Sequence, residues 1–160
     1  MLRNITKEEA ETFVKVAQFV LYRNGYFILE GRGGGLPEFG ISYSDIANLT
    51  EIGLLQAGTF VGQSFKSLPD KKSTSVILYQ NKQLLSITLD PGVKEVFLPA
   101  NVLTRAGKEL YQLIPVTPNI DYLKTVAAAI KGPNVSVGYA EVRSVSDDGR
   151  IHYQQPIIPL

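Results

Sequence analysis

The chain has 160 residues, 44% of them hydrophobic, which suffices for one domain with a buried core. It holds 16 basic and 15 acidic residues, so its formal net charge of +1 gives little overall attraction to nucleic acid or anionic membranes. The lack of cysteine excludes disulfide bonds and thiolate metal sites. No apolar run reaches the roughly 18 residues of a membrane span, so we expect a cytoplasmic bacterial protein that binds no membrane.

The first predicted element is an amphipathic helix over about residues 7–23. Thr6 and Glu9 have the spacing of a capping box, in which the hydroxyl and the carboxylate each accept a backbone N–H. Apolar residues recur at helical spacing as far as Leu21, and the Asn-Gly pair at 24–25 supplies a left-handed stop. One face of this helix must therefore pack against the rest of the protein.

A short strand and a second helix follow, separated by a glycine-rich segment. "YFILEG" at 26–31 is typical of a strand. "GRGGGLPEFG" at 31–40 holds five glycines and one proline, so we expect a flexible surface loop. Ser42 then favours the start of a helix over about 43–52, which ends at Gly53.

Apolar segments predict several strands before the next helix. They are residues 59–65, 75–80, 83–89 and 94–99, with a two-residue hairpin turn at 81–82. Thr104 is a favourable N-cap for a helix over about 105–114. Gly107 in its first turn costs roughly 1 kcal/mol against alanine. We therefore expect another backbone to pass close to this glycine, with the first helix as the candidate.

The last third predicts one more helix and a closing hairpin. The helix starts at Thr117, with Pro118 in its first turn, and ends at the Gly-Pro pair 132–133. The hairpin comprises two strands and a turn, at residues 135–145, 150–154 and 146–149. The apolar tail 156–160 is expected to lie against the body or against a partner.

The order helix, strand, helix, hairpin, helix resembles a winged helix-turn-helix over about residues 7–114. In such domains the hairpin is the wing, and a Leu-Thr-x-x-Gly step like "LTRAG" at 103–107 often opens the helix after it. We therefore predict a single α+β domain, 1–160. Its winged-helix-like core (1–114) would be followed by a helix and a C-terminal β-hairpin (115–160).

Four segments in order also resemble the C-terminal region of an uncharacterised bacterial family, known only as a domain of unknown function. They are "LRNITKEEAETFVKVAQFV", "GISYSDIANLTEIGLLQ", "FLPANVLTRAGKELYQLI" and "PNIDYLKTVAAAIKG". The resemblance covers about residues 2–131 and implies a further helical region ahead of this chain. It brings no activity, so no catalytic residue or cofactor is carried over, although some relatives resemble phage-defence proteins.

The charge distribution bears on nucleic-acid binding by such a fold. The presumed recognition helix within 42–56 holds Asp45 and Glu51 but no Lys or Arg, whereas phosphate contacts and guanine recognition depend on Lys and Arg. In the wing region, 59–83, four lysines against Asp70 give a net charge of +3. The candidate nucleic-acid contacts are Arg32, Lys66, Lys71, Lys72 and Lys82.

Two segments invite a chemical role without supporting it. "GRGGG" at 31–35 lacks the Lys-Ser/Thr pair of a P-loop. The only histidine, His152, would need an orienting carboxylate and a nucleophile, and the nearby Asp147 and Asp148 are typical turn residues. We therefore predict no catalytic residue, no metal site and no enzyme activity.

Our preferred hypothesis is a non-enzymatic protein-interaction or oligomerisation module. Balanced charge and the apolar tail favour it, and aromatic residues exposed together mark protein interfaces. The candidate interface residues are Phe39, Tyr43, Phe65, Tyr79, Ile157 and Ile158. The alternative is a nucleic-acid-binding regulator or phage-defence component that uses the lysine-bearing wing.

Overall fold

The computed structural model describes residues 4–29, 36–56, 61–70 and 72–160. Within these residues the chain forms four α-helices, one 3-10 helix and ten β-strands, so the predicted α+β class is confirmed. The helices are α1 (Lys7–Ala17), η1 (Leu36–Phe39), α2 (Tyr43–Glu51), α3 (Arg105–Tyr111) and α4 (Ile120–Ile130). The strands are β1 (Leu21–Tyr22), β2 (Tyr26–Leu29), β3 (Leu55–Gln56), β4 (Gly62–Phe65), β5 (Thr74–Gln80), β6 (Gln83–Leu89), β7 (Val96–Leu103), β8 (Val135–Val145), β9 (Ile151–Tyr153) and β10 (Ile158–Pro159).

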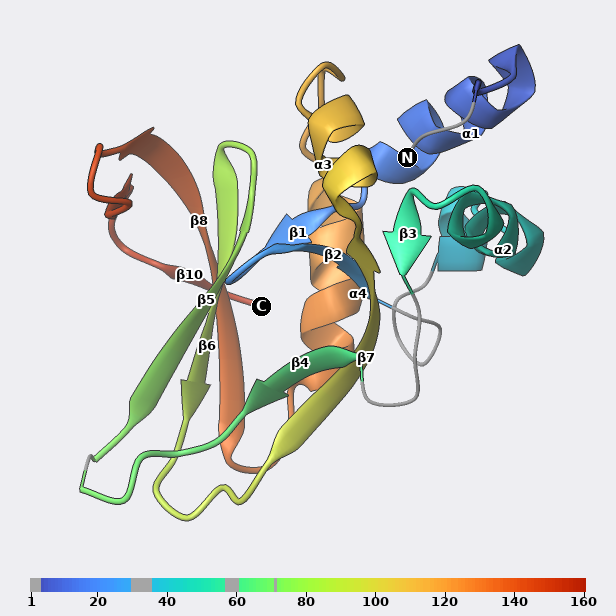
Figure 1. The fold of residues 1–160 in the computed structure, drawn as a ribbon. Helices are drawn as coiled ribbons and strands as arrows, with labels where there is room; N and C mark the ends of the chain where they lie inside the picture. The colour runs from blue at the N-terminus through green and yellow to red at the C-terminus, as the bar shows by residue number, and fades with distance from the viewer. Residues whose placement is uncertain (1–3, 30–35, 57–60, 71) are drawn as a thin grey trace.

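The described strands form one antiparallel sheet that bends about α4. Its order is β10-β8-β6-β5-β1-β2-β7-β3, with β4 paired to β7 and β9 paired to β8. In the view of Figure 1, β5, β6 and β8 lie to the left of α4, β7 curves past its right side, and β4 crosses the view at its lower end. Leu78 and Leu85 of the sheet are fully buried in the same core cluster as Leu123 and Val126 of α4. The predicted winged-helix-like core (1–114) and the predicted extension (115–160) thus share one sheet and one hydrophobic core.

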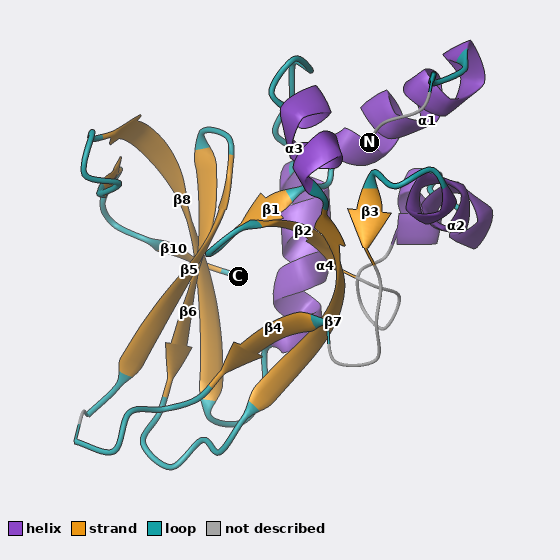
Figure 2. Cartoon of the chain, in the orientation of Figure 1, coloured by secondary structure: helices purple, strands orange, loops and turns teal. Residues whose placement is uncertain are grey.

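The other three helices gather at one end of the sheet (Figure 2). The capping box of α1 is confirmed, since Glu9 N donates to Thr6 Oγ1 (3.1 Å) and Thr6 N donates to the Glu9 carboxylate (2.9 Å). Its predicted extension to residue 23 is wrong, because α1 ends at Ala17 and the chain enters β1 at Leu21. Phe19, Val20 and Leu21 are all buried, and three successive buried residues cannot lie on one face of a helix.

Two further predicted boundaries are wrong for a similar reason. Residues 36–39 do not continue the glycine-rich loop but form η1, in which Leu36 is buried. The last helix starts after Asn119, whose side chain accepts the Tyr122 N–H, and not at Thr117. Thr117 N instead donates to the side-chain oxygen of Gln18, 2.9 Å away, so a tertiary contact replaces the expected cap. The predicted loop residues 31–35 lie outside the described part of the chain.

The β5–β6 hairpin has the predicted two-residue turn, but it does not project from the domain as the predicted wing. Asn81 and Lys82 have φ of 22° and 42°, the left-handed region that such a turn requires. The hairpin lies inside the sheet, between β8 and β1, where a wing would project from its edge. The strand expected at 94–99 is also longer, because β2 and β3 both pair with its second half up to Leu103.

The closing hairpin and the tail follow the sequence expectation. β8 pairs with β9, and β10 pairs with the middle of β8. Leu160 N donates to Val137 O at 3.0 Å, and the Lys131 ammonium donates to Leu160 O at 3.0 Å. The apolar tail therefore lies against the body of the protein.

The start of α3 is fastened to the turn after α2. Thr104 N donates to Leu54 O at 3.1 Å, and the Thr104 hydroxyl donates to Gly53 O while it accepts the Gly107 N–H at 3.1 Å. A Cβ at Gly107 would clash with the Leu54 carbonyl. The prediction that a backbone passes close to Gly107 is confirmed, but that backbone follows α2 and does not belong to the first helix.

We expect Gly107→Ala to destabilise the fold by about 2 kcal/mol. Alanine favours a helix by roughly 1 kcal/mol over glycine, but the clash meets a carbonyl held by Thr104, and overpacking costs typically 1–3 kcal/mol or more. Urea unfolding measures the difference. Gly132→Ala is the matched control, because a Cβ there meets no atom within 4 Å, and it should leave stability equal or slightly higher. Equal stability of the two variants would contradict the close approach.

Candidate binding surface

The described members of the candidate nucleic-acid set lie at two ends of one strand. Lys66 and Lys72 flank the loop between β4 and β5, whereas Lys82 lies in the turn at the far end of β5. The seven residues of β5 separate these ends by ~20 Å. Arg32 and Lys71 lie outside the described residues.

Three of the candidate interface aromatics lie apart from one another. Phe65 is 1% exposed, with the Arg23 guanidinium carbon 5.0 Å from its ring centroid. Phe39 is half-buried and packs edge-on against Tyr122, with the ring centroids 5.7 Å apart. Tyr43 is 88% exposed in the first turn of α2. These side chains therefore do not form a shared surface.

The remaining three interface candidates fall on two surfaces. Ile157 lies over Gly138, where an added Cβ would clash with its side chain, so Ile157 holds the tail to β8. Ile158 is exposed on β10 at the edge of the sheet. Tyr79 alone belongs to an aromatic group that lines a groove.

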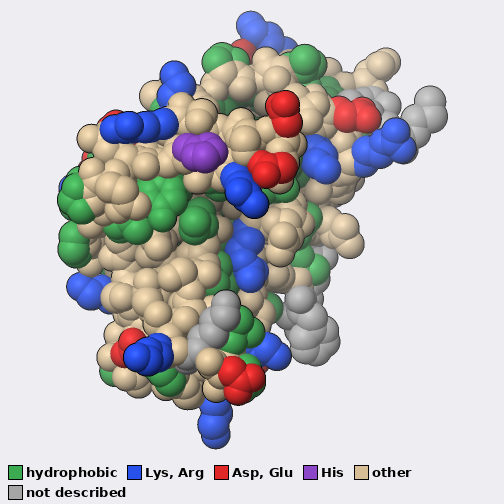
Figure 3. Space-filling model, turned by 90° about the vertical axis from the view of Figure 1, so that its left-hand side faces the viewer, with side chains coloured by type: hydrophobic (Ala, Val, Ile, Leu, Met, Phe, Trp, Pro, Cys, Tyr) green, Lys and Arg blue, Asp and Glu red, His purple; other side chains and the backbone are tan. Residues whose placement is uncertain are grey.

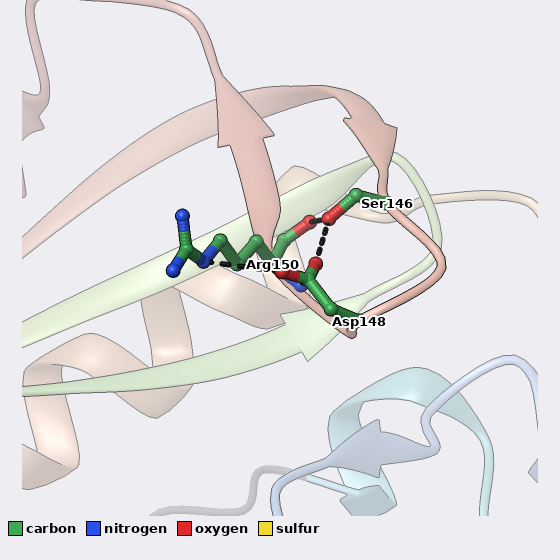
Figure 4. A network of polar contacts seen from close by, with 3 residues as sticks. All are labelled: Ser146, Asp148 and Arg150. Carbon is green, nitrogen blue, oxygen red and sulfur yellow. Dashed lines mark hydrogen bonds and ion pairs between the residues drawn. The ribbon is translucent and has the colours of Figure 1, made fainter.

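The sole histidine stands apart from any reacting partner among the described residues. His152 is exposed on β9 opposite Ser144. Asp148 serves its own turn (Figure 4): its carboxylate accepts from Ser146 Oγ and from Arg150 N (3.2 Å), and lies 3.3 Å from Arg150 Nε. The Ser146 hydrogen bond, followed by that of Arg150, lowers the pKa of Asp148. The described part of the chain also contains no group of three or more His, Cys, Asp or Glu able to hold a metal ion.

A groove of about 350 Å³ opens between β2, β5 and the end of α3. We call it the tyrosine groove; its lining comprises Tyr26, Tyr79, Asn81, Tyr111, Gln112 and residues 114–116. Tyr22 stands opposite both Tyr26 and Tyr79 in the β1–β2 and β1–β5 registers, so the three side chains project from the same face of the sheet. The register of a short hairpin and the end of one helix thereby bring four tyrosines together.

The rings of this group are tilted against one another. The Tyr22 and Tyr26 centroids are 4.9 Å apart at an interplanar angle of 54°, and those of Tyr26 and Tyr111 are 5.1 Å apart at 47°. The Lys108 ammonium lies 6.0 Å from the Tyr26 centroid, one helical turn before Tyr111. The surface therefore combines aromatic rings, phenol hydroxyls and a positive charge.

Apolar side chains extend the surface beyond the groove. Leu113 is 78% exposed just after α3, and Val14 is 45% exposed on α1. The side-chain amide of Gln18 donates to the carbonyl oxygens of both Val14 (3.1 Å) and Pro115 (3.3 Å), so α1 and the segment after α3 adjoin. We call Leu113 and Val14 the apolar rim.

Burial raises the pKa of two phenols of the groove. Desolvation, followed by the nearby Tyr26 and Tyr79, raises the pKa of Tyr111 from its ordinary 10.0 to about 12. Desolvation and then Tyr26 raise the pKa of Tyr79 as well. A tyrosine hydroxyl is already a neutral hydrogen-bond donor at physiological pH, and these shifts move both groups further from ionisation.

Of these four tyrosines, only Tyr79 is among the interface residues predicted from the sequence. A signal for Tyr22 and Tyr26 exists, because the Arg-Asn-Gly step between them is a hairpin turn that makes them cross-strand partners. Tyr111 has no comparable signal, since its contact with Tyr26 joins residues distant in sequence. The predicted end of the helix at residue 114 is wrong, because α3 ends at Tyr111 and the rim residue Leu113 is exposed beyond it.

Fold and surface together define an α+β domain built on a bent antiparallel sheet, with a tyrosine-lined groove at one end of α3. The chain belongs to the family described as "Protein of unknown function (DUF2806)", whose model matches residues 33–127, more than half of the chain. This agrees with the resemblance to a domain of unknown function noted from the sequence. No curated protein and no solved structure matches the chain. None of the helices in the described ranges has the length and apolarity that a membrane crossing requires.

Tyr111 should ionise late in an alkaline titration. Its folded pKa exceeds its unfolded value, so its contribution to stability is intact below about pH 10 and is lost as pH rises towards about 12. Phenolate absorbance against pH should show a step near pH 12 that Tyr111→Phe diminishes. Tyr43→Phe, at an exposed position on α2, is the control and should leave that step intact. A step of equal size in both variants would contradict the assignment.

Proposed function

We propose that this chain is a non-enzymatic protein-interaction or oligomerisation module that binds its partner through the tyrosine groove and the apolar rim. The observation that carries the proposal is the juxtaposition of a solvent-open aromatic groove with Leu113, which is 78% exposed. Tyrosine is enriched at interface hot spots because it combines a large apolar ring with a hydroxyl. A leucine that is this exposed beside such a groove favours a partner that covers both.

The predicted winged-helix-like core is part of the same proposal, but with a different wing. β3 and β7, which flank the inserted strands β4, β5 and β6, pair with each other as the two strands of a wing do. The segment between them is long and contributes its hairpin to the main sheet. We propose a winged-helix-like core in which the place of a free wing is taken by strands of the sheet.

The charge pattern favours a protein partner over nucleic acid. On the face of the molecule seen in Figure 3, Lys and Arg side chains lie scattered, with Asp and Glu among them and a hydrophobic patch beside them. α2, the presumed recognition helix, carries Asp45 in its first turn and Glu51 at its end. This helix carries no Lys or Arg that could contact the phosphates of a polyanion. A bacterial cytoplasmic location and a role in phage defence remain expectations from the sequence.

Leu113→Glu should weaken self-association or partner binding at least about tenfold, because it places an unpaired charge on the apolar rim that the partner covers. Light scattering over a concentration series measures self-association. A photo-crosslinking residue at position 113, in host lysate, identifies any other partner by mass spectrometry. Leu68, which is 42% exposed between β4 and β5, provides the control for both the charge and the crosslinker.

The outcome depends on whether position 113 crosslinks a protein that position 68 does not crosslink. Crosslinks to one defined protein from position 113 and not from position 68 would support the proposal, whether that protein is a second copy or another chain. A monomer at every concentration combined with no protein product at 113 would remove it. Binding of nucleic acid that falls steeply with salt, and further on Lys71→Glu and Lys72→Glu, would instead support the nucleic-acid alternative.

A further inference from the structure

We infer that the tyrosine groove binds an extended, proline-containing peptide segment that carries a carboxylate, an inference that rests on the proposed function and names its partner. Polyproline II segments dock in aromatic-lined grooves, where pyrrolidine rings fill the spaces between aromatic side chains. Their backbone carbonyls have no internal hydrogen bonds and need donors from the groove. A groove that binds such a segment therefore needs both aromatic side chains and free hydrogen-bond donors.

The tilt of the rings shapes the groove for compact, puckered groups. Tyr26 is inclined by 54° to Tyr22 and by 47° to Tyr111, with centroids about 5 Å apart. Rings this close are in contact, so they present their edges and tilted faces to a ligand. A puckered proline ring packs against such edges, whereas a flat nucleobase needs an open parallel ring face on which to stack. The Lys108 ammonium above Tyr26 occupies part of that face.

The donors that a polyproline backbone needs line the same groove. The hydroxyls of Tyr26, Tyr79 and Tyr111 have no hydrogen-bond partner among the described residues. The Asn81 amide nitrogen donates to Val116 O at 2.8 Å and keeps a second N–H, while the exposed Gln112 side chain adds an amide at the edge.

The positive charges beside the groove favour an acidic partner. Lys108 lies beside Tyr26, and Lys82 follows the groove residue Asn81. Neither lysine has an ion-pair partner among the described residues, and Glu109 is engaged by Arg105 at 3.4 Å. A carboxylate on the peptide would meet one of these ammonium groups at the groove edge.

A fluorescent oligoproline peptide of about ten residues that ends in two glutamates is the probe, because it combines a polyproline II segment with the carboxylates that the lysines would meet. Fluorescence anisotropy should show saturable binding. The same peptide with glycine in place of proline should bind at least about tenfold more weakly, since its conformation must be ordered on binding. Lys108→Glu should weaken binding of the acidic oligoproline about fivefold, the size of a surface ion pair. Lys124→Glu, the same change at an exposed site on α4, should not.

Gln112→Ala gives a second variant at an exposed position and should weaken binding a few-fold without unfolding the protein. Equal binding of the proline and glycine peptides, or equal effects of Lys108→Glu and Lys124→Glu, would overturn the inference. If the peptide fails to bind while position 113 still crosslinks a protein, the inference falls and the proposed function stands. Tight binding of a single-stranded oligothymidine that Gln112→Ala weakens would overturn both.

Discussion

Thr104 fastens the start of α3 to the turn that follows α2. Its backbone N–H donates to Leu54 O, its hydroxyl donates to Gly53 O, and the same hydroxyl accepts the Gly107 N–H that begins α3. α3 has seven residues, too few for a helix to be stable alone in water, so tertiary fastening must hold it. Because α3 ends at Tyr111, one wall of the tyrosine groove is set by this contact with the turn after α2.

Side-chain amides hold the part of the groove lining that follows α3. Gln80 is 1% exposed and donates to Gln18 O at 2.7 Å, which ties the end of β5 to the turn after α1. Gln18 in turn accepts the Thr117 N–H and donates to Pro115 O, and Asn81 donates to Val116 O. Residues 115–117 have no regular secondary structure, yet the side chains of Gln18 and Asn81 fix their backbone. A groove whose irregular wall is fixed in this way loses little conformational freedom on binding, which favours affinity for a weakly contacting segment.

The elements that the sequence predicts well are those with local causes. The capping box at Thr6, the helix start at Ser42, the N-cap at Thr104 and the two-residue turn at 81–82 depend on a few neighbouring residues, and all are present. The errors come where distant contacts decide. Leu21 leaves the helical pattern because it pairs with Phe27 in a buried hairpin, and the β5–β6 hairpin enters the sheet because β8, fifty residues later, covers β6 through seven residue pairs.

The family match and the folded unit have different limits, and the groove shows why this matters. The match at 33–127 contains Tyr79, Asn81 and Tyr111 but stops short of Tyr26. It also omits β1 and β2, which join β5 to β7, and β8, which pairs with β6. The matched segment thus lacks strands that lie inside the sheet and one wall of the groove. The proposed binding at the groove would therefore require the β1–β2 hairpin, because that hairpin carries Tyr26 and links β5 to β7 through its own two strands.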